Sequence, residues 1–233
     1  MGVIPCYNSV INYMGNSSIT QYLYQLVDLT AKPLASVERA FAVDSSGISS
    51  PCKDRWIKVR TEYKQHRDYK KWHIGTGVST NIITSVKITS ASNHDNPQFR
   101  ELLIHTAKTF KLKEVSADKG YLAKKNVILV EELGAKPYIA IKDNTNLRKK
   151  GLNAWGRMLT EFQHNKKKFE EHYHKRSNVE TTFSMIKRRF NPYLRSKNEK
   201  AEENELLCLV ICHNLAVLVH SFFELKINLR YLD

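Results

Sequence analysis

The chain has few cysteines, no export signal and no repeated unit. Its four cysteines, Cys6, Cys52, Cys208 and Cys212, are too few and too irregularly spaced for a disulfide framework, which favours a reducing compartment. The N-terminus lacks a basic region followed by an apolar stretch, so the sequence does not predict a secretory signal. No internal repeat or low-complexity tract is visible, which excludes solenoid architectures. We therefore expect a cytoplasmic protein.

Only one long apolar run is present, at residues 206–223, and it approaches the length of a membrane span. It contains two histidines and an asparagine and follows the acidic segment AEENE, so we predict a core helix and no membrane association. Cys208 and Cys212 lie on a face of this helix otherwise filled by Leu and Val. That setting predicts buried thiols rather than a zinc site.

Basic residues are in excess. The formal charge is +14 and the pI is about 9.6, values that indicate a polyanionic partner. The excess is concentrated between residues 142 and 200 in the segments LRKK, NKKKF, HKRS and IKRRF. Clustered Lys and Arg side chains bind phosphates, so a track for the DNA backbone is expected there. An RNA-binding protein would carry the same charge, and charge alone does not choose between them.

The segment at 173–187 has the most informative spacing. Tyr173, Arg176, Glu180 and Lys187 fall within about 60° of one another on a helix, because their offsets are close to whole turns. The adjoining arc is apolar and predicts the buried face; its members are Val179, Phe183, Ile186 and Phe190. A carboxylate beside a core and flanked by cations suits a site where metal and phosphate meet. The alternative is an ordinary basic amphipathic helix.

Two aspartates follow short apolar runs upstream. Asp44 ends the run RAFAV and is followed by Ser-Ser-Gly, and Asp118 ends KEVSA and is followed by Lys-Gly-Tyr. Each pattern predicts a buried strand that delivers a carboxylate into a turn. A single aspartate of this kind is commonly a turn former or helix cap. Together with Glu180, the two form a candidate catalytic triad.

These motifs resemble the DDE transposases of prokaryotic insertion sequences, in particular the group typified by insertion sequence four. The resemblance rests on Asp44 in VDSSG, Asp118 in ADKGY and the Y-x2-R-x3-E-x6-K signature that begins at Tyr173, and it covers the chain from about Leu34 onward. It implies an α/β, ribonuclease-H-like (retroviral-integrase-like) mixed sheet with helices on both faces.

The resemblance also implies a function. Asp44, Asp118 and Glu180 would be the catalytic acids of a metal-dependent transposase and would bind two Mg²⁺ or Mn²⁺ ions. Double-stranded DNA, as transposon ends and target, would be the partner, with a homodimer in the synaptic complex and a nucleoid-associated location. The DNA-binding residues would be Tyr173, Arg176, Lys187, Arg188 and Arg189.

The expected layout is one catalytic domain at 37–233 after a residual helical segment at 1–36. Strands are expected near 41, at 72–78 with 82–89 as a hairpin, before Asp118, and at 137–141. Helices are expected at 18–30, at 97–110 with Asp95 as N-cap, and at 123–133. Residues 53–70 are polar and have no clear period.

Alternatives remain open at this stage. Relatives of this type carry a helical DNA-binding region before the first aspartate, and only about forty residues precede Asp44. The chain is therefore expected to be N-terminally shortened, and a non-catalytic DNA-binding remnant is one alternative. A ribonuclease-H-like nuclease is another. Asp95 and Asp143 are rival acids with structural explanations, and His94 is a possible further site group.

Overall fold

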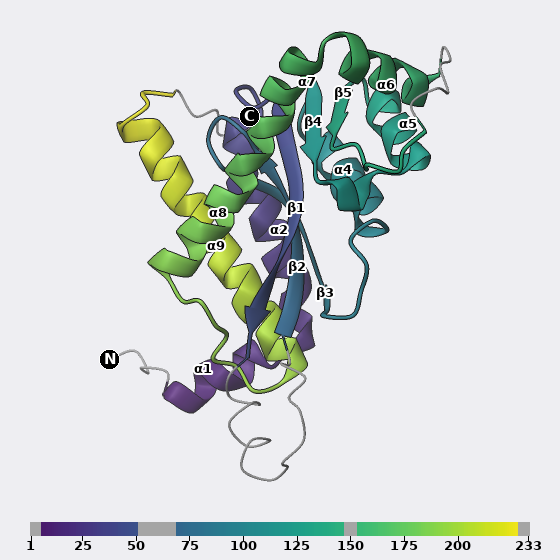
Figure 1. Ribbon diagram of the computed structural model, residues 1–233. Helices are drawn as coiled ribbons and strands as arrows, with labels where there is room; N and C mark the ends of the chain where they lie inside the picture. Colours follow the sequence, from purple (N-terminus) through teal and green to yellow (C-terminus); the bar gives the residue numbers. More distant parts are fainter. Residues whose placement is uncertain (1–5, 51–68, 147–152, 228–233) are drawn as a thin grey trace.

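The computed structural model describes residues 6–50, 69–146 and 153–227, and a five-stranded mixed sheet forms its centre (Figure 1). The spatial order of the strands is β3-β2-β1-β4-β5. β1 pairs antiparallel with β2, which pairs antiparallel with β3, whereas β4 and β5 continue the other side of β1 in parallel. The strands are β1 (Ala40–Ser49), β2 (Tyr69–Gly77), β3 (Ile83–Ser90), β4 (Glu114–Ala117) and β5 (Lys136–Ile139).

Helices cover both faces of this sheet, as the sequence predicted. They are α1 (Tyr7–Met14), α2 (Thr20–Ala31), α4 (Gln98–Ala107), α5 (Lys124–Glu132), α6 (Ala154–His164), α7 (Lys166–Tyr173), α8 (Ser177–Arg189) and α9 (Glu199–Phe223). One core lies between the sheet and α4 and α5, and includes Phe99 and Val127. A second core lies on the face covered by α2, α8 and α9, and includes Val27, Val179 and Val210.

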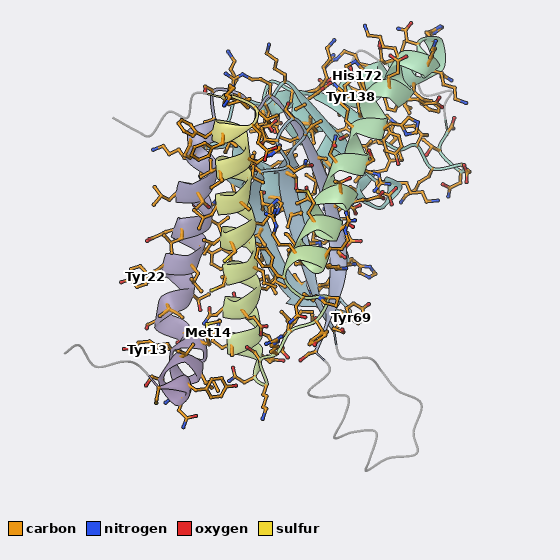
Figure 2. All side chains as sticks on the ribbon, turned by 90° about the vertical axis from the view of Figure 1, so that its left-hand side faces the viewer. Tyr13, Met14, Tyr22, Tyr69, Tyr138 and His172 are labelled. Atoms are coloured by element: carbon orange, nitrogen blue, oxygen red, sulfur yellow. The ribbon has the colours of Figure 1, made fainter. Side chains whose placement is uncertain are left out.

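The long apolar run forms α9, which packs beside α2 on one side of the sheet (Figure 2). Eleven of its residues are buried, which confirms a core helix, while Leu215, Val219 and Phe222 on its outer side are exposed. Among the described residues, α9 is the one helix long and apolar enough to cross a membrane. The prediction of buried thiols is wrong for Cys212, which is exposed, and Cys208 is only half-buried, because both lie off the buried arc that runs through Val210 and Val217.

Most of the expected elements are present. The expected helices at 18–30, 97–110 and 123–133 correspond to α2, α4 and α5, and the hairpin is β2 and β3. The strand before Asp118 is β4, and the strand expected at 137–141 is β5. Most of the polar stretch at 53–70, and Cys52, lie outside the described residues. The division into domains at residue 36 stays a prediction.

The strand that carries Asp44 is longer than predicted. We expected a turn after Asp44, but β1 continues through the serines and Gly47 to Ser49. Its pairing with β2 runs without a break from Phe41 opposite Gly77 to Ser49 opposite Tyr69. Gly47 suits this pairing, since a Cβ there would lie 3.0 Å from the Tyr69 ring. Ladder hydrogen bonds along the whole strand outweigh the turn preference of Ser-Ser-Gly.

Candidate active site

Asp44 lies on the face of the sheet that α8 covers. Side chains alternate along a strand, so Phe41 and Val43 enter the core beneath α4 and α5, whereas Ala42 and Ile48 enter the core beneath α8 and α9. Asp44 shares the face of Ala42 and Ile48, and its side chain is 19% exposed. The carboxylate therefore lies at a partly buried position in the central strand.

Asp118 lies next to Asp44 at the carboxyl end of the neighbouring parallel strand. β1 and β4 are in register with Val43 opposite Ala117, both of them core residues on the other face. Asp118 follows Ala117 with an extended backbone (φ −71°, ψ 163°), so the alternation continues and it shares the face of Asp44. The predicted position of Asp118 after a strand is confirmed.

Glu180 is brought to this face by α8 and is linked to Asp44 through an arginine. Arg176 donates one hydrogen bond to Asp44 Oδ2 at 2.7 Å and another to Glu180 Oε1, also at 2.7 Å. Val179, Phe183 and Ile186 form the buried face of α8, as predicted. That packing fixes the side of the helix on which Arg176 and Glu180 lie.

We predicted one continuous helix over residues 173–187, but the structure divides it. α7 ends at Tyr173, residues His174–Arg176 form a 3₁₀ turn, and α8 begins at Ser177. A tighter turn at a helix end changes the angular positions of the residues before it. Tyr173 still lies beside Arg176, whose guanidinium carbon is 5.9 Å from the centre of the Tyr173 ring.

The acids influence one another electrostatically. Burial raises the pKa of Asp44, and the charges of Asp118 and Glu180 raise it further. The backbone N–H of Ser45, which donates to Asp44 Oδ1 at 2.8 Å, and the Arg176 guanidinium oppose that rise in pKa. Asp44 is thus within electrostatic reach of both other carboxylates.

This donor set has the chemistry of a divalent-metal site, since carboxylate oxygens are the ligands that Mg²⁺ and Mn²⁺ prefer. A cationic group, the guanidinium of Arg176, already bridges Asp44 and Glu180. No three His, Cys, Asp or Glu side chains in the described ranges have the spacing of a formed metal site. Asp44, Asp118 and Glu180 therefore fit a metal by chemistry, and ion binding would replace the contacts of Arg176.

The other predicted DNA-binding residues divide into two groups. Lys187 is half-buried and donates to Ser46 Oγ at 2.8 Å and to the Gly47 carbonyl at 3.0 Å, and burial lowers its pKa. Arg188 and Arg189 are exposed on α8. Within the described part of the chain, neither of these two arginines has a side-chain hydrogen bond or ion pair.

Comparison with known families agrees with this geometry. The family described as "Transposase DDE domain" matches residues 35–215, which include all three acids and the four signature residues that begin at Tyr173. The chain belongs to the DDE transposases. No significant match was found among curated proteins. The mixed sheet of this transposase, covered by helices on both faces, is the ribonuclease-H-like fold expected for the family.

The transposase also contains a polar cluster that sequence reasoning missed. We predicted Asp95 to be an N-cap, but Pro97 precedes the first residue of α4 and no side chain caps that helix. Asp95 Oδ1 instead contacts Lys71 Nζ at 2.5 Å and accepts from Ser45 Oγ at 2.9 Å. It also lies 3.4 Å from His73 Nδ1. Lys71 and His73 share one face of β2, and this period-two spacing is the one sequence signal for the cluster.

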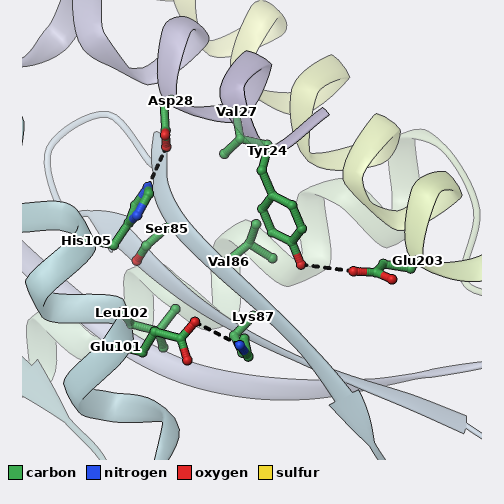
Figure 3. A pocket seen from close by; sticks show the side chains of 10 residues that line it. All are labelled: Tyr24, Val27, Asp28, Ser85, Val86, Lys87, Glu101, Leu102, His105 and Glu203. Atoms are coloured by element: carbon green, nitrogen blue, oxygen red, sulfur yellow. Dashed lines mark hydrogen bonds and ion pairs between the residues drawn. The ribbon is translucent and has the colours of Figure 1, made fainter. Parts of the chain in front are cut away.

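The remaining candidates lie elsewhere. Asp143, in the segment after β5, and His94, before α4, are both exposed. A separate hollow of about 390 Å³ lies between α2, β3, α4 and α9, and includes none of the three acids (Figure 3). Its polar groups are already paired, in Asp28–His105, Lys87–Glu101 and Tyr24–Glu203 contacts.

Proposed function

We propose that this transposase cleaves and joins DNA strands in a reaction that depends on divalent metal. The observation that carries the proposal is the placement of the three acids on one face of the sheet: Asp118 follows the strand that pairs in parallel with the strand of Asp44, and Arg176 bridges Asp44 and Glu180. One carboxylate in a strand, one directly after the neighbouring parallel strand and one on a packed helix would supply the oxygen ligands. Such a set can hold cations against a phosphodiester.

Each acid has a distinct role in this proposal. Asp44, in the central strand, would be the central metal ligand, and Asp118 and Glu180 would complete the ligand set. Bound Mg²⁺ or Mn²⁺ supplies activation of the attacking oxygen and neutralises charge on the leaving oxygen. The protein side chains hold these ligands in place and need not act as nucleophiles.

Two displacements at phosphorus make up the reaction. In hydrolysis a water oxygen bonds to phosphorus, the bond from phosphorus to the 3′-oxygen breaks, and the products are a 3′-hydroxyl and a 5′-phosphate. In strand transfer that 3′-hydroxyl attacks a target phosphodiester, and a new 3′-hydroxyl leaves. One phosphodiester replaces another, so strand transfer needs no external energy source.

Basic side chains near the acids would hold the DNA backbone. Arg176 contacts two of the acids, Tyr173 lies beside Arg176, and Lys187 donates to Ser46 in the strand of Asp44. Arg188 and Arg189 are exposed at the end of α8. We assign these five residues to phosphate contacts at the transposon end. A homodimer that holds two ends, acting on the cytoplasmic nucleoid, completes the proposal.

The test is strand cleavage by the purified chain on duplexes that carry the DNA flanking its gene, with Mg²⁺, Mn²⁺ or EDTA. We expect cleavage with either metal and none with EDTA. Asp44→Asn, Asp118→Asn and Glu180→Gln should each reduce cleavage by more than about 100-fold, within the range of effects seen for essential catalytic groups. Asp28→Asn, which alters a carboxylate paired with His105, is the matched control and should cleave normally.

Loss of cleavage in Asp28→Asn as well would show that the substitutions act through folding. Metal-dependent cleavage that survives all three triad substitutions would contradict the proposal. Tight DNA binding without cleavage under any of these conditions would favour a non-catalytic DNA-binding protein.

A further inference from the structure

The face of β1 opposite the acids carries its own polar contact. Asp44 faces α8, so Ser45, the next residue, faces α4 and the core beneath it. Ser45 interacts in both directions. Its backbone N–H donates to Asp44 Oδ1 at 2.8 Å, and its hydroxyl donates to Asp95 Oδ1 at 2.9 Å. Ser45 thus links Asp44 to an aspartate on the other side of the sheet.

Asp95 is itself held in place from β2. Lys71 Nζ lies 2.5 Å from Asp95 Oδ1, and the fully buried His73 lies beside it. Burial lowers the pKa of His73 to about 4, so its imidazole is neutral near pH 7 and Lys71 is the cation that balances Asp95. The Asp95 side chain is 30% exposed. An aspartate with a close cation and a fixed hydroxyl donor has little freedom to move.

Asp95 acts electrostatically on the buried Tyr121, as two of the candidate acids do. Burial raises the pKa of Tyr121, and the charges of Asp95, Asp44 and Asp118 raise it further. Its buried hydroxyl has no well-formed hydrogen bond to any described residue, although Ser45 lies near enough to oppose that rise. One buried phenol therefore lies within electrostatic reach of three aspartates, including Asp95.

We propose that Asp95 is a positioning residue for Asp44, acting through Ser45. This inference rests on the proposed metal-dependent function. Asp44 is contacted on one side by Arg176, a partner that ion binding would displace, and on the other by the Ser45 N–H. The Ser45 N–H belongs to the backbone of β1, so this contact does not depend on a side chain that ion binding would displace. The Asp95–Ser45 hydrogen bond fixes the strand segment that supplies it, as groups behind metal ligands commonly do.

The experiment measures Mn²⁺ binding to the purified chain by electron paramagnetic resonance, without DNA. Asp95→Ala and Ser45→Ala should each weaken Mn²⁺ binding by about 10–100-fold, the usual effect of losing a group that orients a ligand. The double variant should bind Mn²⁺ as tightly as the single variant with the lower affinity, because the two substitutions remove the same hydrogen bond. Asp95→Asn keeps an oxygen acceptor for Ser45 and should recover most of the affinity. Asp28→Ala is the matched control and should bind as wild type does.

Three results would overturn the inference. Wild-type Mn²⁺ affinity in Asp95→Ala would show that Asp95 does not act on the site. Additive losses in the double variant would show that Asp95 and Ser45 act independently. Equal losses in Asp95→Asn and Asp95→Ala, with a lowered Tm in both, would indicate a role in stability alone. If wild-type protein binds no Mn²⁺, the metal-dependent function fails and this inference fails with it; the first three results leave that function intact.

Discussion

Arg176 occupies the position between two of the three acids and accounts for most of the polar contact in the site. It binds Asp44 and Glu180 at equal distances of 2.7 Å, and its side chain is 19% exposed. A guanidinium in that place lowers the repulsion between the carboxylates. The same charge opposes a metal ion that needs the same oxygens. Arg176 therefore stabilises the metal-free site and at the same time competes with metal ions for the same carboxylate oxygens.

Removing this side chain should have opposite effects on metal binding and catalysis. In Arg176→Ala we expect Mn²⁺ to bind about tenfold tighter, since a hydrogen bond to a charged group contributes ~1.5–3 kcal/mol and ~1.4 kcal/mol is tenfold. Cleavage should nevertheless fall, because a phosphate contact is lost. Mn²⁺ titration and a cleavage assay measure the two effects, with Lys87→Ala, which removes a cation paired with Glu101 outside the site, as control. Weaker Mn²⁺ binding in Arg176→Ala would contradict the competition.

Asp44 should reduce the stability of the fold near neutral pH. Burial, with Asp118 and Glu180, raises its pKa, so the folded protein holds this proton more tightly than the unfolded chain does. Its contribution to stability is therefore lost as pH rises from the ordinary aspartate pKa through the raised value. Without added metal, Asp44→Asn should raise Tm at pH 7 by about 2–4 °C, which corresponds to ~1 kcal/mol for a chain of this size. Calorimetry from pH 4 to 7 should show the gain shrinking toward low pH; a constant difference would refute this assignment.

The sequence predicted which helices and strands form, and in which order, better than it predicted where each one ends. Apolar spacing identified the buried arc of α8, because Val179, Phe183 and Ile186 follow helical periodicity whatever precedes the helix. Asp44 and Asp118 were found because each follows a short apolar strand. The continuation of β1 was missed, since Ser-Ser-Gly favours a turn locally and only pairing with β2 keeps it extended. The contacts of Asp95 were missed for a similar reason, because its partners are set by sheet register and lie up to fifty residues away.

Gly77, at the end of β2, packs closely against the buried side chain of Glu38. Glu38 is fully buried, and its carboxylate accepts hydrogen bonds from the backbone of Ser79 and from the backbone and hydroxyl of Thr80. A Cβ at Gly77 would lie 2.4 Å from the carboxyl carbon of Glu38. Gly77→Ala should therefore destabilise the fold by about 1–3 kcal/mol, the usual cost of overpacking, and this would appear as a lowered Tm.

Gly120→Ala is the matched control for that substitution. A Cβ at Gly120 would meet no atom within 4 Å, and the φ of Gly120 is not positive. Its Tm should stay within about 2 °C of wild type, as for a surface substitution of ~0.5 kcal/mol or less. Equal Tm values for the two variants would show that Glu38 can move aside.

The whole molecule carries its charge unevenly. The net charge of +14 includes an exposed lysine triplet at the start of α7 and the two exposed arginines at the end of α8. Lys166 of this triplet pairs with Glu170, as Lys87 does with Glu101 elsewhere on the surface, but neither arginine at the end of α8 has a partner among the described residues. Exposed lysines and arginines contact DNA phosphates, and such contacts position a protein on DNA without reading its sequence. Binding by this chain should therefore depend strongly on salt.

Replacing Arg188 and Arg189 by alanine should reduce that dependence. Each lost phosphate contact lowers the slope of log K against log salt by about 0.9, so the double variant should lose ~2 units of slope. Fluorescence anisotropy on a short duplex between 50 and 200 mM salt covers the range over which such losses are large. Lys87→Ala, which removes a cation paired with Glu101, should leave the slope nearly unchanged. An unchanged slope in the arginine variant would place the DNA elsewhere on the surface.

The alternation of side chains along β1 makes the site sensitive to the insertion or deletion of a single codon. Asp44 and Ser46 face α8, whereas Ser45 faces Asp95, so the two halves of the site depend on consecutive residues of one strand. Loss or gain of one codon before Asp44 would shift the strand by one position and exchange the two faces. The carboxylate would then point away from Glu180 and into the core beneath α4 and α5, where an unpaired charge is costly. A single in-frame codon deletion just before Asp44 should therefore remove this acid from the site.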